Sequence, residues 1–269
     1  MSTTTAAPRP SHRPALGGLT WTFLSLEIRR VLRNRRTLVF ILLMPPVFFV
    51  LFGLPQRGQT FGNGSPVTGY VMISLAVYGA MVATTSAGAM VGVERVQGWS
   101  RQLRLTPLRP AAYVAAKVIT AMVLGLLAVA VEFTVGAVFG VRMPVNVWLI
   151  AGLAAWLGSL VFAAFGLFMG YLAPAENVLQ VLGPILAILA MFGGLFVPLE
   201  ILPHTLQMIA KFTPVYGVGQ IARSPLTGGG FNTVAAANIA AWTAAFGFGA
   251  ARLFRRDTAR NEDGIAFPS

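Results

Sequence analysis

Residues 37–54 read TLVFILLMPPVFFVLFGL, a run of 18 residues without one charged side chain. A helix of about 20 apolar residues is long enough to cross the hydrocarbon core of a bilayer. The chain around it has 269 residues, of which 56% are hydrophobic and 10% charged, and its mean hydropathy is +0.72. Only helices and closed barrels satisfy their backbone polar groups in lipid. The sequence therefore predicts an all-α integral membrane protein.

A cleaved signal peptide is the alternative interpretation of residues 37–54. The apolar run is too long for one, the basic region before it is extended, and no A-x-A-like cleavage site follows. Pro45 and Pro46 are expected to kink this helix, because proline removes a helical hydrogen bond.

Six spans are predicted along the chain, and their boundaries follow the apolar runs. They lie near residues 37–54, 68–92, 114–140, 147–172, 178–197 and 232–251. Together they form one transmembrane domain, residues 20–252, between a disordered tail at 1–19 and a second tail at 253–269.

The basic residues predict the orientation of these spans. Sixteen Lys and Arg fall in the N-terminal region, after the second span and in the C-terminal tail. The other side of the membrane receives Arg57, Arg142, Lys211 and Arg223. Because Lys and Arg accumulate in cytoplasmic loops, both termini are expected in the cytoplasm. The net charge of +12 is accordingly assigned to topology and anionic lipids, and no nucleic-acid partner is expected.

The segment before the first span, residues 20–36, combines apolar positions at helical spacing with many arginines. We expect an amphipathic helix in the membrane interface, and a simple basic flank is the alternative. Its candidate residues are Trp21, Leu24, Ile28, Arg29, Arg30 and Arg33.

A second charged segment, VERVQGWSRQLRLTPLRP at 93–110, separates the second and third spans. Val96, Trp99 and Leu103 share one face if Val93 to Arg104 is helical, and Glu94 would then suit the N-terminal end of that helix. This segment is either a loop that only obeys the positive-inside rule or a helix that docks on a cytoplasmic partner.

Familiar catalytic patterns do not occur in the sequence. It has no G-x-x-x-x-G-K-[ST], no H-E-x-x-H and no G-x-S-x-G. It has no cysteine and only His12 and His204, so we expect neither a metal site nor thiol chemistry. Pairs of glycines four residues apart occur inside three spans and could mark close helix contacts, but with 29 glycines roughly three such pairs arise by chance, so the spacing is weak evidence.

Glu132 lies in the middle of the third span. A carboxylate there costs about 2.5–3.5 kcal/mol on insertion scales, so it is expected to face protein or water. It either contacts a substrate or gate, or is a polar group satisfied by a neighbouring helix.

Two stretches of the chain resemble one family. The loop VGVERVQGWSRQLRLTPLRPAAYVAAK at 91–117 is similar to the E-R-x-x-G, L-x-x-T-P, Y and K pattern that follows the second span of ABC-2 type transporter permeases. The segment GGLFVPLEILPHTLQMIAKFTPVYGVGQIAR at 193–223 resembles the proline-containing connection between their last two spans. The nearest likeness is to the drug and antibiotic branch, which includes daunorubicin exporters.

The resemblance implies a half-transporter. Two such subunits, identical or different, would pair in a bacterial cell membrane, and each would dock on a separate cytoplasmic ATPase that binds ATP and Mg. Residues 198–223 would form short re-entrant helices at the outer face. A cytoplasmic coupling helix would meet the ATPase, with contacts from Glu94, Arg95, Val96, Trp99, Arg101, Leu103 and Arg104.

The function expected is therefore export of a hydrophobic or amphiphilic compound, with no catalytic residue and no cofactor in this chain. A secondary drug/proton antiporter is the alternative, although only Glu132 offers it an intramembrane titratable group. A membrane-embedded enzyme is a third possibility, and the clusters of His, Asp or Glu that it would need are absent from the sequence.

Overall fold

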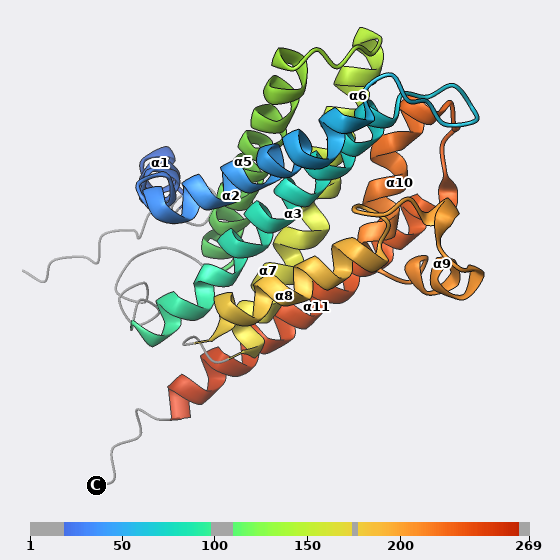
Figure 1. Cartoon of the computed structure of the whole chain (residues 1–269). Helices are drawn as coiled ribbons and strands as arrows, with labels where there is room; N and C mark the ends of the chain where they lie inside the picture. The colour runs from blue at the N-terminus through green and yellow to red at the C-terminus, as the bar shows by residue number, and fades with distance from the viewer. Residues whose placement is uncertain (1–18, 98–109, 174–176, 264–269) are drawn as a thin grey trace, which may run out of the picture.

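A computed structural model of the chain describes residues 19–97, 110–173 and 177–263. The described chain is a bundle of helices, with one isolated bridge between Thr60 and Pro66 and no named strand (Figure 1). The α-helices are α1 (Trp21–Leu32), α2 (Arg35–Phe48), α3 (Val67–Val96), α5 (Pro110–Val138), α6 (Val145–Gly158), α7 (Leu160–Leu172), α8 (Val178–Phe192), α9 (His204–Ala210), α10 (Pro214–Thr227) and α11 (Thr233–Asp263). Shorter turns are η2 (Phe49–Gly53), η3 (Leu54–Gln56) and η4 (Leu199–Ile201).

Four of the described helical stretches are long and apolar enough to cross a membrane. They are Val67–Val96, Ala111–Val138, Val145–Leu172 and Thr233–Asp257, and each exceeds the roughly 20 residues that a bilayer requires. Two shorter apolar helices, Ile41–Gln56 and Val178–Phe192, lie where the first and fifth spans are predicted. The prediction of an all-α, multi-pass membrane protein is confirmed, whereas the number of six spans stays a prediction.

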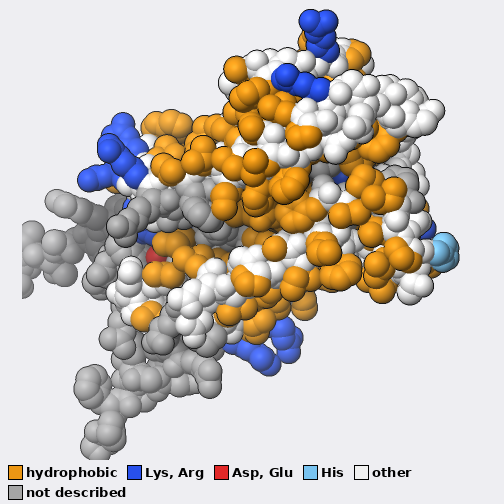
Figure 2. Space-filling view, viewed as in Figure 1, with side chains coloured by type: hydrophobic (Ala, Val, Ile, Leu, Met, Phe, Trp, Pro, Cys, Tyr) orange, Lys and Arg blue, Asp and Glu red, His pale blue; other side chains and the backbone are white. Residues whose placement is uncertain are grey.

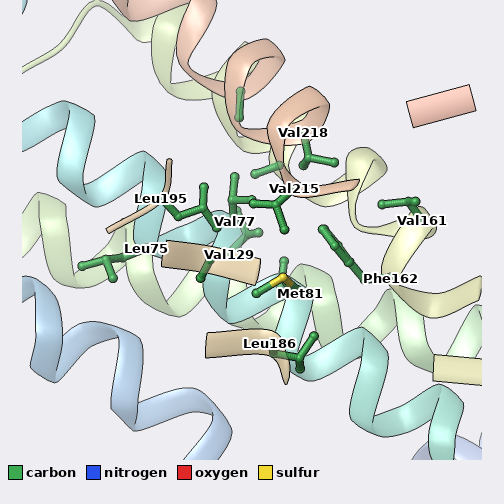
Figure 3. Packing of buried hydrophobic residues seen from close by; sticks show 14 of the residues in the cluster. Leu75, Val77, Met81, Val129, Val161, Phe162, Leu186, Leu195, Val215 and Val218 are labelled. Carbon is green, nitrogen blue, oxygen red and sulfur yellow. The ribbon is translucent and has the colours of Figure 1, made fainter. Parts of the chain in front are cut away.

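Helix α3 is the centre of the bundle. It is apolar on all sides, and 78% of its most apolar window is buried, as expected for a span that neighbouring helices surround. Its side chains Val77 and Met81 pack with Phe162 of α7, Leu186 of α8 and Val215 of α10 (Figure 3). Displacing α3 would therefore disturb most of the described helices.

Close contact between α3 and α7 depends on glycines four residues apart, a spacing that was only weak evidence in the sequence. A Cβ atom on Gly166 would lie 2.2 Å from the carbonyl oxygen of Thr85, and one on Gly88 would lie 2.7 Å from that of Ala163. Gly92 and Gly170 face each other's backbones in the same way. These two pairs do mark a close helix contact, because small residues let two membrane helices approach to backbone contact.

The outer surface of the described helices is largely apolar. Figure 2 shows hydrophobic side chains covering the middle of one face, with Lys and Arg gathered toward its edges. Exposed side chains such as Leu43, Leu149 and Phe248 have no role in the core and suit contact with lipid.

Several boundaries differ from the predicted ones. The stretch at 147–172 divides at Ser159 into α6 and α7, and α11 continues to Asp263, so the predicted tail beginning at 253 is helical at first. Helix α3 runs on to Val96, which places Val93–Val96 in the last turn of a long helix. The prediction of a separate helix that starts at Val93 was therefore wrong, because the helix of the preceding span continues through Glu94 and Arg95.

Residues 198–223 form short helical pieces, η4, α9 and α10, between α8 and α11. Pro203 and Pro214 precede or start two of them, as expected for a residue that suits the first helical turn. This agrees with the prediction of short helices at this place in the chain.

Candidate functional site

The two ends of the bundle differ in the number of charged side chains that they hold. At one end α1, the last turn of α3, the first turns of α5 and the last turns of α11 come together, and this is called the charged end (Figure 1). The far end holds the 57–66 loop, the α5–α6 turn, α9 and α10; there Ser65 donates to the carbonyl oxygen of Leu226 at 3.0 Å. The segment 98–109, which joins α3 to α5, leaves from the charged end.

Helix α1 begins where Thr20 caps it, since the Thr20 hydroxyl accepts a hydrogen bond from the backbone N–H of Phe23 at 3.2 Å. Leu24 and Ile28 are half-buried on the face toward the bundle, while Trp21 is 78% exposed. Arg29 and Arg33 are exposed. The amphipathic helix is thus present, and its contact with lipid stays a prediction.

One acidic residue of α1 points into the bundle, unlike the exposed arginines. Glu27 is 4% exposed, and its carboxylate forms an ion pair with Lys117 of α5, which is 2% exposed. Lys117 also donates to Glu94 of α3, so a single ammonium group joins three helices.

The carboxylate of Glu94 is the centre of this group. It accepts hydrogen bonds from Arg30 of α1 and from Tyr113 of α5, in addition to the one from Lys117. We call Glu27, Arg30, Glu94, Tyr113 and Lys117 the charge cluster.

The charge cluster is electrically balanced. Two carboxylates face one ammonium and one guanidinium group, and the phenol adds a neutral donor. Burial opposes the charge on Arg30, but Glu94 and Glu27 outweigh it and raise the pKa of the guanidinium. Buried ions are tolerated only when paired in this way, so the cluster fixes α1, α3 and α5 relative to one another.

Arg95, the next residue, lies on the other side of α3. It forms an ion pair with Asp257 of α11 and donates to the carbonyl oxygen of Tyr171 of α7 at 3.2 Å. Consecutive residues of one turn thus hold the helices on both sides of α3.

These contacts change the interpretation of the predicted coupling residues. Glu94 is 2% exposed and bound within the chain, so its side chain is not presented to a partner, and it stands near the C-terminal end of its helix rather than the N-terminal end. Val96 is 70% exposed at the end of α3. Trp99, Arg101, Leu103 and Arg104 lie outside the described residues, and their docking role stays a prediction.

Glu132 belongs to α5 and lies inside the bundle, on the face of α5 that packs toward α3. Its neighbours one turn away, Ala128 and Gly136, pack toward Gly79 and Met72 of α3. The side chain of Glu132 has no exposed surface, and neither carboxylate oxygen has a hydrogen-bond partner among the described residues. The structure thus favours neither a substrate in contact with it nor a neighbouring helix that satisfies it.

A buried arginine marks the far end. Arg223 of α10 is 2% exposed and donates to the Ser74 hydroxyl of α3 at 3.0 Å and to the carbonyl oxygen of Gly194 at 2.7 Å. Its guanidinium carbon lies 4.6 Å from the ring centroid of Tyr70, a cation–π contact. Arg223 thereby ties α10 to α3 and to the end of α8.

The bundle, its short helices after α8 and its charged end can be compared with known proteins. A family model described as ABC-2 type transporter matches residues 18–226. The chain belongs to the ABC-2 type transporter family. It is also 30% identical over 205 residues to YvfS of Bacillus subtilis (strain 168), which carries the name of a transport permease; the match covers 76% of this chain and 83% of that protein.

Family membership confirms the resemblance found in the sequence and makes the chain a membrane transport subunit. It does not distinguish a drug-exporting branch of ABC-2 permeases from the others, so that part stays a prediction.

Four residues that hold the charged end of this permease were not predicted as site residues: Glu27, Tyr113, Lys117 and Asp257. Two of them carried a usable signal. Glu27 is the one acid in a segment with five arginines, and Lys117 is one of two lysines in the chain. Isolated charges of this kind beside apolar spans suggest a buried pair, but the sequence does not say which acid meets which base.

Proposed function

We propose that this chain is the membrane-spanning subunit of an ATP-driven exporter for hydrophobic or amphiphilic compounds. ATP and Mg would be bound by a separate ATPase, since the sequence lacks the glycine-rich loop that cradles nucleotide phosphates. A second permease subunit would complete the pathway in the cell membrane, with both chain termini in the cytoplasm.

The observation that carries this proposal is the charge cluster. It lies at the end of α3, where Val93–Arg104, the segment that the resemblance assigns to the ATPase, begins. A displacement of this segment would move the last turn of α3 first. Because Glu94 is bound to Arg30 and Lys117, the displacement would then reach α1 and α5 as well.

Retention of an ATPase tests the docking step. The chain is co-expressed with candidate ABC ATPases, and the ATPase that remains with the purified membrane subunit is quantified. We expect Trp99→Ala and Gln102→Pro to reduce retention at unchanged membrane levels, because an aromatic anchor in an interface is worth about 2 kcal/mol or more. Phe231→Ala is the matched control, since this aromatic side chain is 78% exposed at the far end. Normal retention in both variants would show that the segment does not dock.

The alternative, a drug/proton antiporter, is favoured by one observation, the burial of Glu132 without a hydrogen-bond partner among the described residues. Uptake of ethidium into inverted membrane vesicles separates the two functions. We expect uptake to require ATP, to survive collapse of the proton gradient, and to decrease in Glu132→Gln. Uptake that a proton gradient drives without ATP, and that Glu132→Gln abolishes, would establish the antiporter.

A further inference from the structure

Helix α11 is the least buried of the four described helical stretches that are long enough to cross a membrane. Only 11% of its most apolar window is buried, whereas for α3 the value is 78%. It packs along α7 and, nearer the far end, on α10. At the charged end it is held by apolar contacts of Ala250, Leu253 and Phe254 with α3 and α7, and by one ion pair to α3.

Arg95 of α3 forms this ion pair with Asp257 of α11. Its Nε donates to one carboxylate oxygen of Asp257 at 3.0 Å, and a terminal nitrogen donates to the other oxygen. Two parallel hydrogen bonds of this kind fix the orientation of the two side chains as well as the distance between them. Both side chains are less than one third exposed, at 29% and 27%.

The same guanidinium group also holds α7. It donates to the carbonyl oxygens of Gly170 at 3.4 Å and Tyr171 at 3.2 Å, which a C-terminal helix end leaves without helical partners. Its carbon atom lies 5.4 Å from the Tyr171 ring centroid, and that ring meets Phe254 of α11 edge-on at 5.7 Å. Arg95 thus joins the ends of α3, α7 and α11 at one point.

The helix continues past this point. Residues 258–263 extend α11 beyond Asp257, while the family match ends at residue 226. Neither the family match nor the predicted coupling residues give this extension a role. It directly follows Asp257, the residue that pairs with Arg95 in the last turn of α3.

We propose that the C-terminal part of α11, from residue 251 onward, is a second moving element of the transport cycle, which Arg95 and Asp257 couple to α3. This inference rests on the proposed function, because the ATPase is what displaces α3. Glu94 carries the displacement to α1 and α5, and Arg95 carries it to α11 on the opposite side. Arg95 and Asp257 act here as positioning residues.

The test places an environment-sensitive dye, bimane, on Ala251→Cys, an exposed position in a chain without cysteine. Fluorescence of the full complex with its ATPase is measured in nanodiscs before and after trapping with Mg-ATP and vanadate. We expect the bimane fluorescence to change on trapping when the chain carries no other substitution. In Asp257→Arg the response should fall at least about five-fold, the lower end of typical coupling between two sites.

Charge exchange distinguishes coupling from simple loss of structure. Adding Arg95→Asp to Asp257→Arg restores an ion pair with reversed partners, so the response should return to at least about half of the original. Arg255→Asp reverses an exposed charge on the same helix and should leave the response unchanged.

Three results would overturn the inference: no response in the original complex while it hydrolyses ATP, an unchanged response in Asp257→Arg, or no recovery in the exchanged pair. A chain that retains no ATPase contradicts the proposed function itself, and the inference falls with it.

Discussion

The charged end of this permease shows how a membrane protein can keep ions in its interior. The chain has only eight acidic residues, and Glu27, Glu94 and Asp257 each meet a base there. An unpaired ion in a low-dielectric interior costs several kcal/mol, so each member of the charge cluster is needed by the others. Lys117 has the most partners of opposite charge, since it pairs with two carboxylates from two helices.

Replacing this lysine should therefore destabilise the fold. In Lys117→Met, Glu27 and Glu94 lose their shared cation, and we expect a loss of about 3–5 kcal/mol, the usual cost of breaking a buried pair. Thermal unfolding of the purified chain in detergent measures it. The other lysine, Lys211, is exposed at the far end, so Lys211→Met serves as the control. Equal melting temperatures for both variants would mean that the cluster carries no stability.

At the scale of elements, the approach of α3 to α7 decides the shape of the core. Gly88, Gly92, Gly166 and Gly170 lie at the crossing, where any side chain would meet backbone atoms of the other helix. Backbone cannot move aside as a flexible side chain can, so the two helices would have to separate. This crossing is what keeps α3 in the middle of the bundle.

Gly166→Ala tests that crossing with one methyl group. The new Cβ atom would lie 2.2 Å from the carbonyl oxygen of Thr85, and we expect a loss of about 1–3 kcal/mol, as for other overpacked cores. Gly183→Ala in α8 is the matched control, because a Cβ atom there meets nothing within 4 Å. The melting temperature and the monodisperse fraction after purification measure the difference. Both should fall in Gly166→Ala and not in Gly183→Ala, and equal values for the two variants would contradict the prediction.

Much of this arrangement of elements could be predicted from the sequence, because long apolar runs and prolines have few structural solutions in lipid. The long helices, the amphipathic α1 and the short pieces after α8 all follow from local patterns. Side-chain pairing could not be predicted in the same way. That Glu94 would face Lys117 and Arg95 would face Asp257 depends on how helices distant in the sequence are placed side by side. The predicted second span ended at residue 92 because the charged residues Glu94 and Arg95 follow it. The helix itself continues through both residues to Val96.

At the scale of the whole molecule, more basic residues gather at one end of the bundle than at the other. Arg29, Arg33, Arg255 and Arg256 are exposed at the charged end, and Arg142 and Lys211 belong to the far end. The positive-inside rule predicts from this that the charged end faces the cytoplasm.

Single cysteines test this orientation, since the chain has none of its own. Gly62→Cys at the far end and Gln97→Cys at the charged end are both exposed positions. In intact cells, a membrane-impermeant maleimide should label position 62 and leave position 97 unlabelled until the cells are opened. Labelling of position 97 from outside would reverse the orientation and exclude docking of a cytoplasmic ATPase at this end.

The proposed function requires that the charge cluster couple an ATPase to α3 and α5, which both run on to the far end. The most direct test follows one buried far-end residue, Ala222, replaced by cysteine in the complex with its ATPase. Trapping with Mg-ATP and vanadate should change the maleimide reaction rate at this position at least about five-fold. Glu94→Gln, which removes the central carboxylate of the cluster, should abolish that change while the complex still binds its ATPase and hydrolyses ATP. The same rate change in Glu94→Gln as in the unaltered cluster would contradict the account.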